Sequence, residues 1–206
     1  MTVRHPFDFD ALLCDLDGVI RFYDTTEVSR LELAAGLPDG TTAGFAFAPE
    51  RDGLFLLGKM THAEWVESTA EALTEVTSVP RARELAAAFA SSPFRADPEI
   101  LELLARVRKH VPLVLVTNAT TDLEGDLTRL GLDGFVDHVV SSARIGVAKP
   151  DERFYEIAAG RVGVPYDRCL FVDDSEENVK AAVALGMTGV HYRELADLKR
   201  ALSPLP

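Results

Sequence analysis

The sequence predicts an α/β fold, a doubly wound parallel sheet with a small α-helical domain inserted into it. Three observations lead to this class. Short apolar runs, too short for helices, recur along the chain and end in polar residues. Amphipathic segments with helical spacing alternate with these runs after Pro93. Between residues 23 and 92 the pattern is helical only, so we expect an α/β core domain of 1–22 and 93–206 and a helical domain of 23–92.

Length and charge narrow the class of protein. The chain has 206 residues, of which 47% are hydrophobic, enough for a substantial core. Lys and Arg number 21 against 33 Asp and Glu, a formal net charge of −12 that argues against binding nucleic acid. No apolar run approaches a membrane span, and Met1 to Asp10 lacks the apolar core of a signal peptide. With Cys14 and Cys169 expected as buried thiols, we expect a cytoplasmic protein that binds neither nucleic acid nor membranes.

The first strand is predicted over Ala11 to Cys14, an apolar run that stops at two carboxylates. Side chains alternate along a strand, so Asp15 and Asp17 are expected to point the same way, and Gly18 permits a sharp turn after them. Acidic side chains beside a buried strand are costly unless a cation or a function holds them. The alternative interpretation is that Asp15 and Asp17 are solvated loop residues without a function. The rest of the chain decides between a functional pair and this alternative.

The helical domain has clear boundaries in only part of its length. Thr61 and Glu64 form the sequence of a capping box at a helix start. Residues 41–57, rich in Gly, Phe and Leu, receive no assignment. Helices are predicted around Val28 to Ala35, from Thr61 to Ala72 and from Pro80 to about Ala90.

After Pro93, strands and helices alternate. The predicted helices begin at Asp97–Pro98, near Leu123, after Lys149–Pro150 and before Val179. The predicted strands are Leu113–Val116, Phe135–Val140, Leu170–Val172 and a short one at Gly189–His191. All-apolar strands between amphipathic helices indicate a parallel sheet covered on both faces.

Polar residues gather where these strands end. In parallel sheets, ligands bind outside the carboxyl ends of the strands, so the residues placed there are candidates for a common site. Lys149 precedes a helix whose N-terminus also favours anions. The residues at the three strand ends are Asp15, Asp17, Thr117, Asn118, Asp173 and Asp174.

Four of these segments together resemble the motifs of the haloacid dehalogenase superfamily of hydrolases. The motifs are Asp15-Leu16-Asp17-Gly18-Val19, Thr117-Asn118, Lys149-Pro150 and Phe171-Val172-Asp173-Asp174, the last continued by Ser175-Glu176-Glu177-Asn178. Their order and separations match the family, and the helical domain lies where phosphatase-type members carry a cap domain after the first motif. The resemblance spans nearly the whole chain and implies a Rossmann-like core.

The resemblance also implies a role for each residue. Asp15 would be the nucleophile that forms an aspartyl-phosphate, and Asp17 the general acid–base. Thr117, Asn118 and Lys149 would bind the phosphoryl group, with Asn118 equally interpretable as a turn residue. Asp15, Asp173 and the backbone carbonyl of Asp17 would hold Mg²⁺. Asp174 and Asn178, four residues apart on a helical turn, would support these ligands.

The expected function is therefore hydrolysis of a small phosphorylated metabolite by a magnesium-dependent phosphatase. Three alternatives are a phosphomutase acting on a sugar phosphate, a 2-haloacid dehalogenase and a non-catalytic binding protein. Dehalogenases of the family lack an aspartate at the position of Asp17, since a halide leaving group needs no acid, so Asp17 favours phosphoryl transfer. Because every charged motif position is filled, a non-catalytic role is disfavoured. The substrate and the oligomeric state cannot be derived from the sequence.

Overall fold

The computed structural model describes residues 7–203 and divides the chain into two compact units. Of these residues, 7–22 and 96–203 form the α/β unit, and 23–95 form the insertion unit. Residues 93–95, which the sequence analysis assigns to the α/β domain, thus belong to the insertion unit. Each unit has a hydrophobic core of its own.

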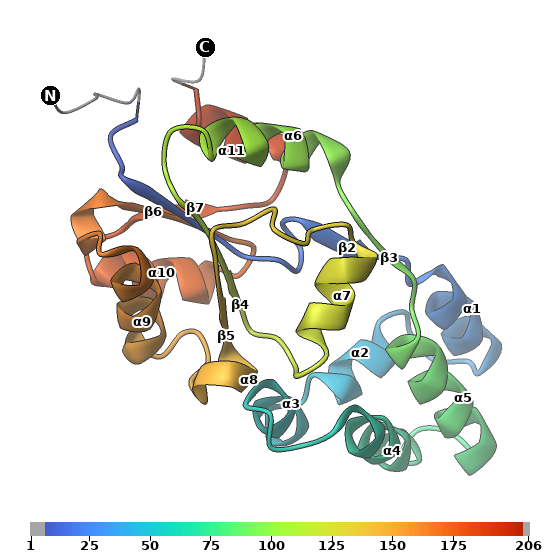
Figure 1. Ribbon diagram of the computed structural model, residues 1–206. Coiled ribbons are helices and arrows are strands. Elements are labelled where there is room, and N and C mark those ends of the chain that lie inside the picture. Colours follow the sequence, from blue (N-terminus) through green and yellow to red (C-terminus); the bar gives the residue numbers. More distant parts are fainter. Residues whose placement is uncertain (1–6, 204–206) are drawn as a thin grey trace, which may run out of the picture. The chain divides into compact units, whose positions relative to one another are not determined.

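A five-stranded sheet forms the centre of the α/β unit, with the order β5-β4-β1-β6-β7 (Figure 1). All four strand pairs are parallel, and Leu13 of the central strand lies opposite both Val114 and Phe171. The strands are β1 (Ala11–Cys14), β4 (Leu113–Thr117), β5 (His138–Ser141), β6 (Cys169–Asp173) and β7 (Thr188–His191). The predicted doubly wound parallel sheet is confirmed.

Helices cover both faces of this sheet, because alternate side chains of each buried strand point to opposite faces. Leu12 and Cys14 of β1 pack on one face, against α6 (Pro98–Val107), α7 (Leu123–Arg129) and α11 (Leu195–Ala201). Ala11 and Leu13 pack on the other, with α8 (Ser142–Ile145), α9 (Glu152–Val162) and α10 (Glu176–Ala184). A 3₁₀ turn, η1 (Tyr166–Arg168), leads into β6.

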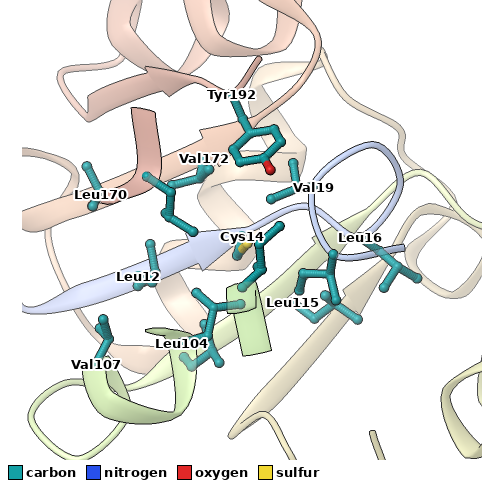
Figure 2. Close-up of a cluster of buried hydrophobic side chains, with 14 of the residues drawn as sticks. Leu12, Cys14, Leu16, Val19, Leu104, Val107, Leu115, Leu170, Val172 and Tyr192 are labelled. Carbon is teal, nitrogen blue, oxygen red and sulfur yellow. The ribbon is translucent and has the colours of Figure 1, made fainter. Parts of the chain in front are cut away.

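Cys14 lies within the first of these cores. Figure 2 shows its sulfur among apolar side chains that include Leu12, Leu115 and Val172. Burial raises the pKa of the Cys14 thiol, and the adjacent Asp15 carboxylate adds to that rise. The thiol therefore stays protonated and unreactive, as the sequence predicts for a buried structural cysteine.

Helices make up most of the insertion unit. Thr61 opens α4 with the predicted capping box: its hydroxyl accepts from the Glu64 N–H at 3.2 Å, and the Glu64 carboxylate accepts from the Thr61 N–H at 2.8 Å. Trp65 of α4 stacks on Phe55 with ring centroids 4.8 Å apart and donates to the Ala46 carbonyl. The helices are α1 (Thr26–Ala34), α2 (Thr41–Ala46), α3 (Pro49–Leu56), α4 (His62–Leu73) and α5 (Val79–Ala90).

Several elements differ from the sequence-based expectation. The unassigned residues 41–57 form α2 and α3, and the pairing strands β2 (Arg21–Tyr23) and β3 (Phe94–Ala96) lie where the chain passes between its units. The predicted strand at Phe135 begins later, at His138, because Phe135 closes a turn by donating its N–H to Leu132. Helix α11 was not predicted. Among residues 7–203, no helix is long and apolar enough to cross a membrane.

Candidate active site

The polar residues of three adjacent strand ends meet at one edge of the sheet. Asp15 directly follows β1, Thr117 is the last residue of β4, and Asp173 is the last residue of β6. Because β1 lies between β4 and β6, these three side chains belong to neighbouring strands. The Asp15 N–H continues the sheet by donating to the Val172 carbonyl at 2.9 Å.

Lys149 joins the two buried carboxylates of this edge. Its Nζ lies 2.9 Å from Asp15 Oδ1 and 2.6 Å from Asp173 Oδ2, and it also donates to the Val116 carbonyl at 2.9 Å. The Lys149 side chain is only 1% exposed. All three of its N–H donors are therefore bonded, which fixes the ammonium between the strands.

Burial dominates the electrostatics of this group. Burial raises the pKa of Asp15 to about 7, the Lys149 ammonium opposes the rise, and the Asp173 carboxylate adds to it. For Lys149, burial favours the neutral amine, but Asp15 and Asp173 outweigh it and hold the pKa of Lys149 above its ordinary value. With two carboxylates around one ammonium, the group carries excess negative charge that a cation would balance.

A third carboxylate, that of Asp174, joins those of Asp15 and Asp173 in a group that could hold a metal ion, the metal group. Oxygens of Asp15, Asp173 and Asp174 all lie within 4.8 Å of one another. Hard carboxylate oxygens are the donors that Mg²⁺ prefers, so this donor set fits that ion. The sequence predicts only a supporting role for Asp174, whereas the structure places its carboxylate close to those of Asp15 and Asp173. The expectation for the backbone carbonyl of Asp17 stays a prediction.

Gly18 makes room for Asp174. Its φ is +73°, and a Cβ at this position would lie 2.2 Å from Asp174 Oδ2. A side chain at residue 18 would therefore displace the carboxylate as well as strain the backbone. The lack of a side chain at Gly18 thus leaves room for the Asp174 carboxylate.

Asp173 is held in place from α10. Its Oδ1 accepts from the Ser175 N–H at 2.9 Å and from Asn178 Nδ2 at 3.0 Å. The Asn178 carbonyl accepts in turn from the Tyr155 hydroxyl at 2.9 Å. Asn178 therefore orients a carboxylate of the metal group, a contact of the kind that positions metal ligands in proteins.

The Asn118 amide bonds to the backbone of Lys149. Its Nδ2 donates to the Lys149 carbonyl at 2.9 Å, and its Oδ1 accepts from the Lys149 N–H at 2.8 Å. Both ends of the Asn118 amide are thus bonded to the backbone of Lys149, and the expected contact of this side chain with phosphate stays a prediction. The sequence could not show this, because the two residues are 31 positions apart and meet only through the loop before α9.

Two hydroxyls at the strand ends are buried without partners. Thr117 Oγ1 and Ser141 Oγ are fully enclosed and make no hydrogen bond within residues 7–203. Thr117 and Ser141 lie opposite each other in the β4–β5 register. An unsatisfied buried hydroxyl is costly, and each of these two keeps an unused hydrogen-bonding capacity. Ser141 was missed, although its position after an apolar strand resembles that of Thr117.

Asp17 is bound by Arg21, for which the sequence predicts no role. Arg21 Nε donates to Asp17 Oδ1 at 2.6 Å, and Arg21 Nη2 donates to Asp17 Oδ2 at 2.7 Å. The Asp17 side chain is 39% exposed and lies close enough for its charge to help raise the pKa of both Asp15 and Asp174. The carboxylate is thus beside the metal group but outside it.

The fold and this edge of the sheet define a class of protein: an α/β enzyme fold whose buried lysine and acidic group lie at the strand ends. Within that class, the family model of haloacid dehalogenase-like hydrolases matches residues 9–186. The chain belongs to the haloacid dehalogenase-like hydrolases.

Curated relatives include several phosphatases. Flavin mononucleotide hydrolase 1 of Arabidopsis thaliana is 35% identical over 77 residues, which cover 37% of this chain and 31% of the relative. Phosphoserine phosphatase of Thermus thermophilus is 35% identical over 126 residues, covering 58% and 51%. The matches thus span about a third to a half of these relatives. Phosphatase MT3486 of Mycobacterium tuberculosis is 29% identical with coverage of 86% and 84%.

Solved structures share the fold over nearly the full chain. The HAD family enzyme BT-2542 of Bacteroides thetaiotaomicron, in complex with magnesium and inorganic phosphate, has a TM-score of 0.69 at 19% identity, covering 92% of this chain and 98% of its own. L-2-haloacid dehalogenase of Xanthobacter autotrophicus has a TM-score of 0.63 at 20% identity, with coverage of 95% and 82%. At these identities the likeness concerns the fold alone.

Proposed function

We propose that the protein is a magnesium-dependent phosphatase that hydrolyses a small phosphorylated metabolite through an aspartyl-phosphate on Asp15. The observation that carries the proposal is the buried Lys149, bonded to both Asp15 and Asp173 beside the carboxylate of Asp174. This arrangement places a nucleophilic carboxylate, a fixed positive charge and a set of hard oxygen donors at one strand edge.

The chain's own residues supply each step of the proposed reaction. A carboxylate oxygen of Asp15 attacks phosphorus, the bond to the leaving oxygen breaks, and Asp17 gives that oxygen a proton. Asp17 then takes a proton from the water that attacks the phosphorus of the aspartyl-phosphate, which returns Asp15 to its carboxylate form. Thr117, whose hydroxyl makes no hydrogen bond within the described part of the chain, donates to a phosphoryl oxygen.

Charge is the main obstacle to this reaction, because a carboxylate must approach a phosphate dianion. Lys149 compensates part of the negative charge from its fixed position between Asp15 and Asp173. When bound by the acidic group, Mg²⁺ would neutralise further negative charge and polarise the phosphoryl oxygens.

The relatives support phosphate-ester hydrolysis over the alternatives. Their names include a phosphoserine phosphatase and a pyrimidine 5′-nucleotidase, both of which describe small phosphorylated substrates. A dehalogenase has no leaving oxygen to protonate, so it would leave Asp17 without a task. By the same family resemblance, the insertion unit is proposed to act as a cap that contributes to substrate choice.

The test measures release of inorganic phosphate from a panel of phosphorylated amino acids, nucleotides, flavin mononucleotide and sugar phosphates. Turnover is expected with Mg²⁺ and is lost when a chelator removes the metal. Full turnover in excess chelator would contradict the role of the metal. Isomerisation of a sugar phosphate without phosphate release would show a phosphomutase instead.

A further inference from the structure

Arg21 connects Asp17 to helix α7. Two of its guanidinium nitrogens bind the two oxygens of Asp17, at 2.6 and 2.7 Å, and Nη1 binds Asp126 Oδ2 at 2.7 Å. The Arg21 side chain is 5% exposed and that of Asp126 is 15% exposed. A two-point contact between a guanidinium and a carboxylate fixes the direction of both groups, which a single bond cannot do.

The backbone around Arg21 is also held. The Arg21 N–H donates to the Leu16 carbonyl at 2.7 Å, and the Arg21 carbonyl accepts from the Gly18 N–H at 3.0 Å. These bonds close the turn that carries Asp17. Asp17 is therefore attached to a rigid support at its backbone and at both carboxylate oxygens.

Stability alone is a weak reason for such an arrangement. Removing a guanidinium from water costs several kcal/mol, and apolar residues of similar size often replace a buried ion pair without loss of stability. The same helix offers a contrast in Arg129, which also pairs with Asp126 but is 67% exposed. The buried Arg21 binds the Asp17 carboxylate as well as Asp126.

We propose that Arg21 is a positioning residue for the general acid–base Asp17, and that Asp126 anchors Arg21 for this purpose. The inference rests on the proposed phosphatase function and adds a specific part to it. Arg21 acts through Asp17 and has no direct contact with the substrate. Its loss should therefore weaken proton transfer to the leaving oxygen and leave phosphate binding unchanged.

The dependence of the reaction rate on the leaving group of the substrate isolates the loss of proton transfer by Asp17. An alkyl phosphate needs a proton on its leaving oxygen, whereas a nitrophenyl phosphate releases a stable anion and depends little on an acid. The ratio of kcat/KM for the alkyl ester to kcat/KM for the aryl ester therefore reports how well Asp17 is placed. Since kcat/KM covers only the steps up to transfer to Asp15, later hydrolysis of the aspartyl-phosphate does not enter.

The experiment compares Arg21→Lys, Arg21→Gln and Asp126→Asn with the wild type. Each variant should lower the alkyl-to-aryl ratio, by up to about 10²-fold for Arg21→Gln, since misplacing a catalytic group by about 1 Å has effects of that size. Arg21→Lys keeps the buried positive charge but can bind only one of the two Asp17 oxygens. Its alkyl-to-aryl ratio should therefore fall less than that of Arg21→Gln. Competitive inhibition by inorganic phosphate should stay unchanged.

Arg129→Gln is the matched control, because it removes the exposed partner of Asp126 and leaves Arg21 in place. Its alkyl-to-aryl ratio should equal that of the wild type. The double variant with Asp17→Asn completes the test. If Arg21 acts through Asp17, then Asp17→Asn lowers the ratio by itself, and adding Arg21→Gln lowers it no further.

The outcomes that would contradict the role of Arg21 differ from the outcome that would contradict the proposed phosphatase function. If the wild type hydrolyses phosphate esters but the Arg21 variants keep its ratio, Arg21 has no positioning role. The same conclusion follows if Arg21→Gln and Asp17→Asn lower the ratio additively. If the wild type hydrolyses no ester of either kind, the proposed function fails and the inference fails with it. Circular dichroism checks folding, and Arg21→Lys carries the test should Arg21→Gln not fold.

Discussion

The two oxygens of the Asp15 carboxylate have different surroundings. Oδ1 accepts from the Leu16 N–H at 2.7 Å and lies 2.9 Å from Lys149 Nζ. Within residues 7–203, Oδ2 has no hydrogen-bond partner in the structure. One oxygen is thus held by the protein while the other is available, which suits a nucleophile whose direction of attack must be fixed.

Asp15→Asn is expected to lower phosphatase turnover by several orders of magnitude, because an amide is a far weaker nucleophile than a carboxylate. Acid-quenched mass spectrometry with an aryl phosphate should show a phosphorylated wild-type enzyme and no phosphorylated variant. Asp10→Asn is the control, since Asp10 pairs with Arg168 before the strand begins and should keep normal activity. Near-normal rates in Asp15→Asn would remove Asp15 from the nucleophilic role.

Gly18→Ala should damage the metal group specifically. The added Cβ would meet Asp174 Oδ2 at 2.2 Å, and the left-handed backbone conformation would cost a further roughly 1–2 kcal/mol of stability. Gly36→Ala is a matched control, because Gly36 has a φ of +72° but nothing within 4 Å of the added atom.

Both glycine variants should lose stability in denaturant unfolding, but only Gly18→Ala should also lose Mg²⁺ affinity in a calorimetric titration. Equal Mg²⁺ affinity in the two variants would show that the contact with Asp174 has no bearing on metal binding.

The sequence predicts well which side chains lie at the carboxyl ends of the strands. It predicts less well which groups these side chains contact. Asp15, Thr117 and Asp173 could be located because a parallel sheet brings its strand ends together. The partner of the Asn118 amide depends on loop geometry, and so does the distance between Asp174 and the other carboxylates. The alternation of side chains along a strand predicts neither the partner of Asn118 nor the position of the Asp174 carboxylate.

At the scale of elements, hydrophobic pattern decided which predictions held. The buried strands and the helices that cover them show runs and periodicities strong enough to locate. Strands β2 and β3 are only three residues each, and their pairing rather than their pattern makes them strands. Helix α11 could have been found, since Leu195, Leu198 and Leu202 follow helical spacing and pack on the core.

Asp137 links two elements at the opposite edge of the sheet. Its Oδ1 accepts from Arg108 Nε at 3.0 Å and its Oδ2 from the Leu113 N–H at 2.8 Å, which ties the end of α6 to the start of β4. Burial acts to raise the pKa of Asp137, but the bonds from Arg108 and Leu113 outweigh it and hold the pKa below its ordinary value.

The stabilisation by Asp137 should therefore depend on pH. A carboxylate with a lowered folded-state pKa stabilises the fold above its unfolded pKa of about 3.9, and this contribution is lost as pH falls through the folded-state value. Asp137→Asn should lower the free energy of unfolding at pH 7 by about 1 kcal/mol, a value that allows for partial exposure.

Urea unfolding of wild type and Asp137→Asn at several pH values measures this difference, which should shrink below pH 4. Asp133→Asn, on the same loop but bonded to Thr128 rather than to an arginine, is the control. A difference that stays constant from pH 7 to pH 3 would contradict the electrostatic account.

At the scale of the whole molecule, the metal group and the single tryptophan belong to different units. Asp15, Asp173 and Asp174 lie in the α/β unit, whereas Trp65 lies in the insertion unit. The contacts of Trp65 with Phe55 and with the Ala46 carbonyl are also within the insertion unit. Tryptophan fluorescence therefore reports on the insertion unit.

Mg²⁺ should stabilise the α/β unit and leave the tryptophan signal unaffected. A ligand that binds only the folded state at 100 times its dissociation constant stabilises it by about 2.7 kcal/mol. Urea unfolding is monitored by amide hydrogen exchange in β1 and β6 and, separately, by the fluorescence of Trp65. With Mg²⁺, the urea midpoint reported by β1 and β6 should rise, while the midpoint reported by Trp65 should not change. Asp173→Asn should remove the shift in β1 and β6. Equal shifts of both signals would show that the two units unfold as one, and no shift in either would contradict metal binding by the acidic group.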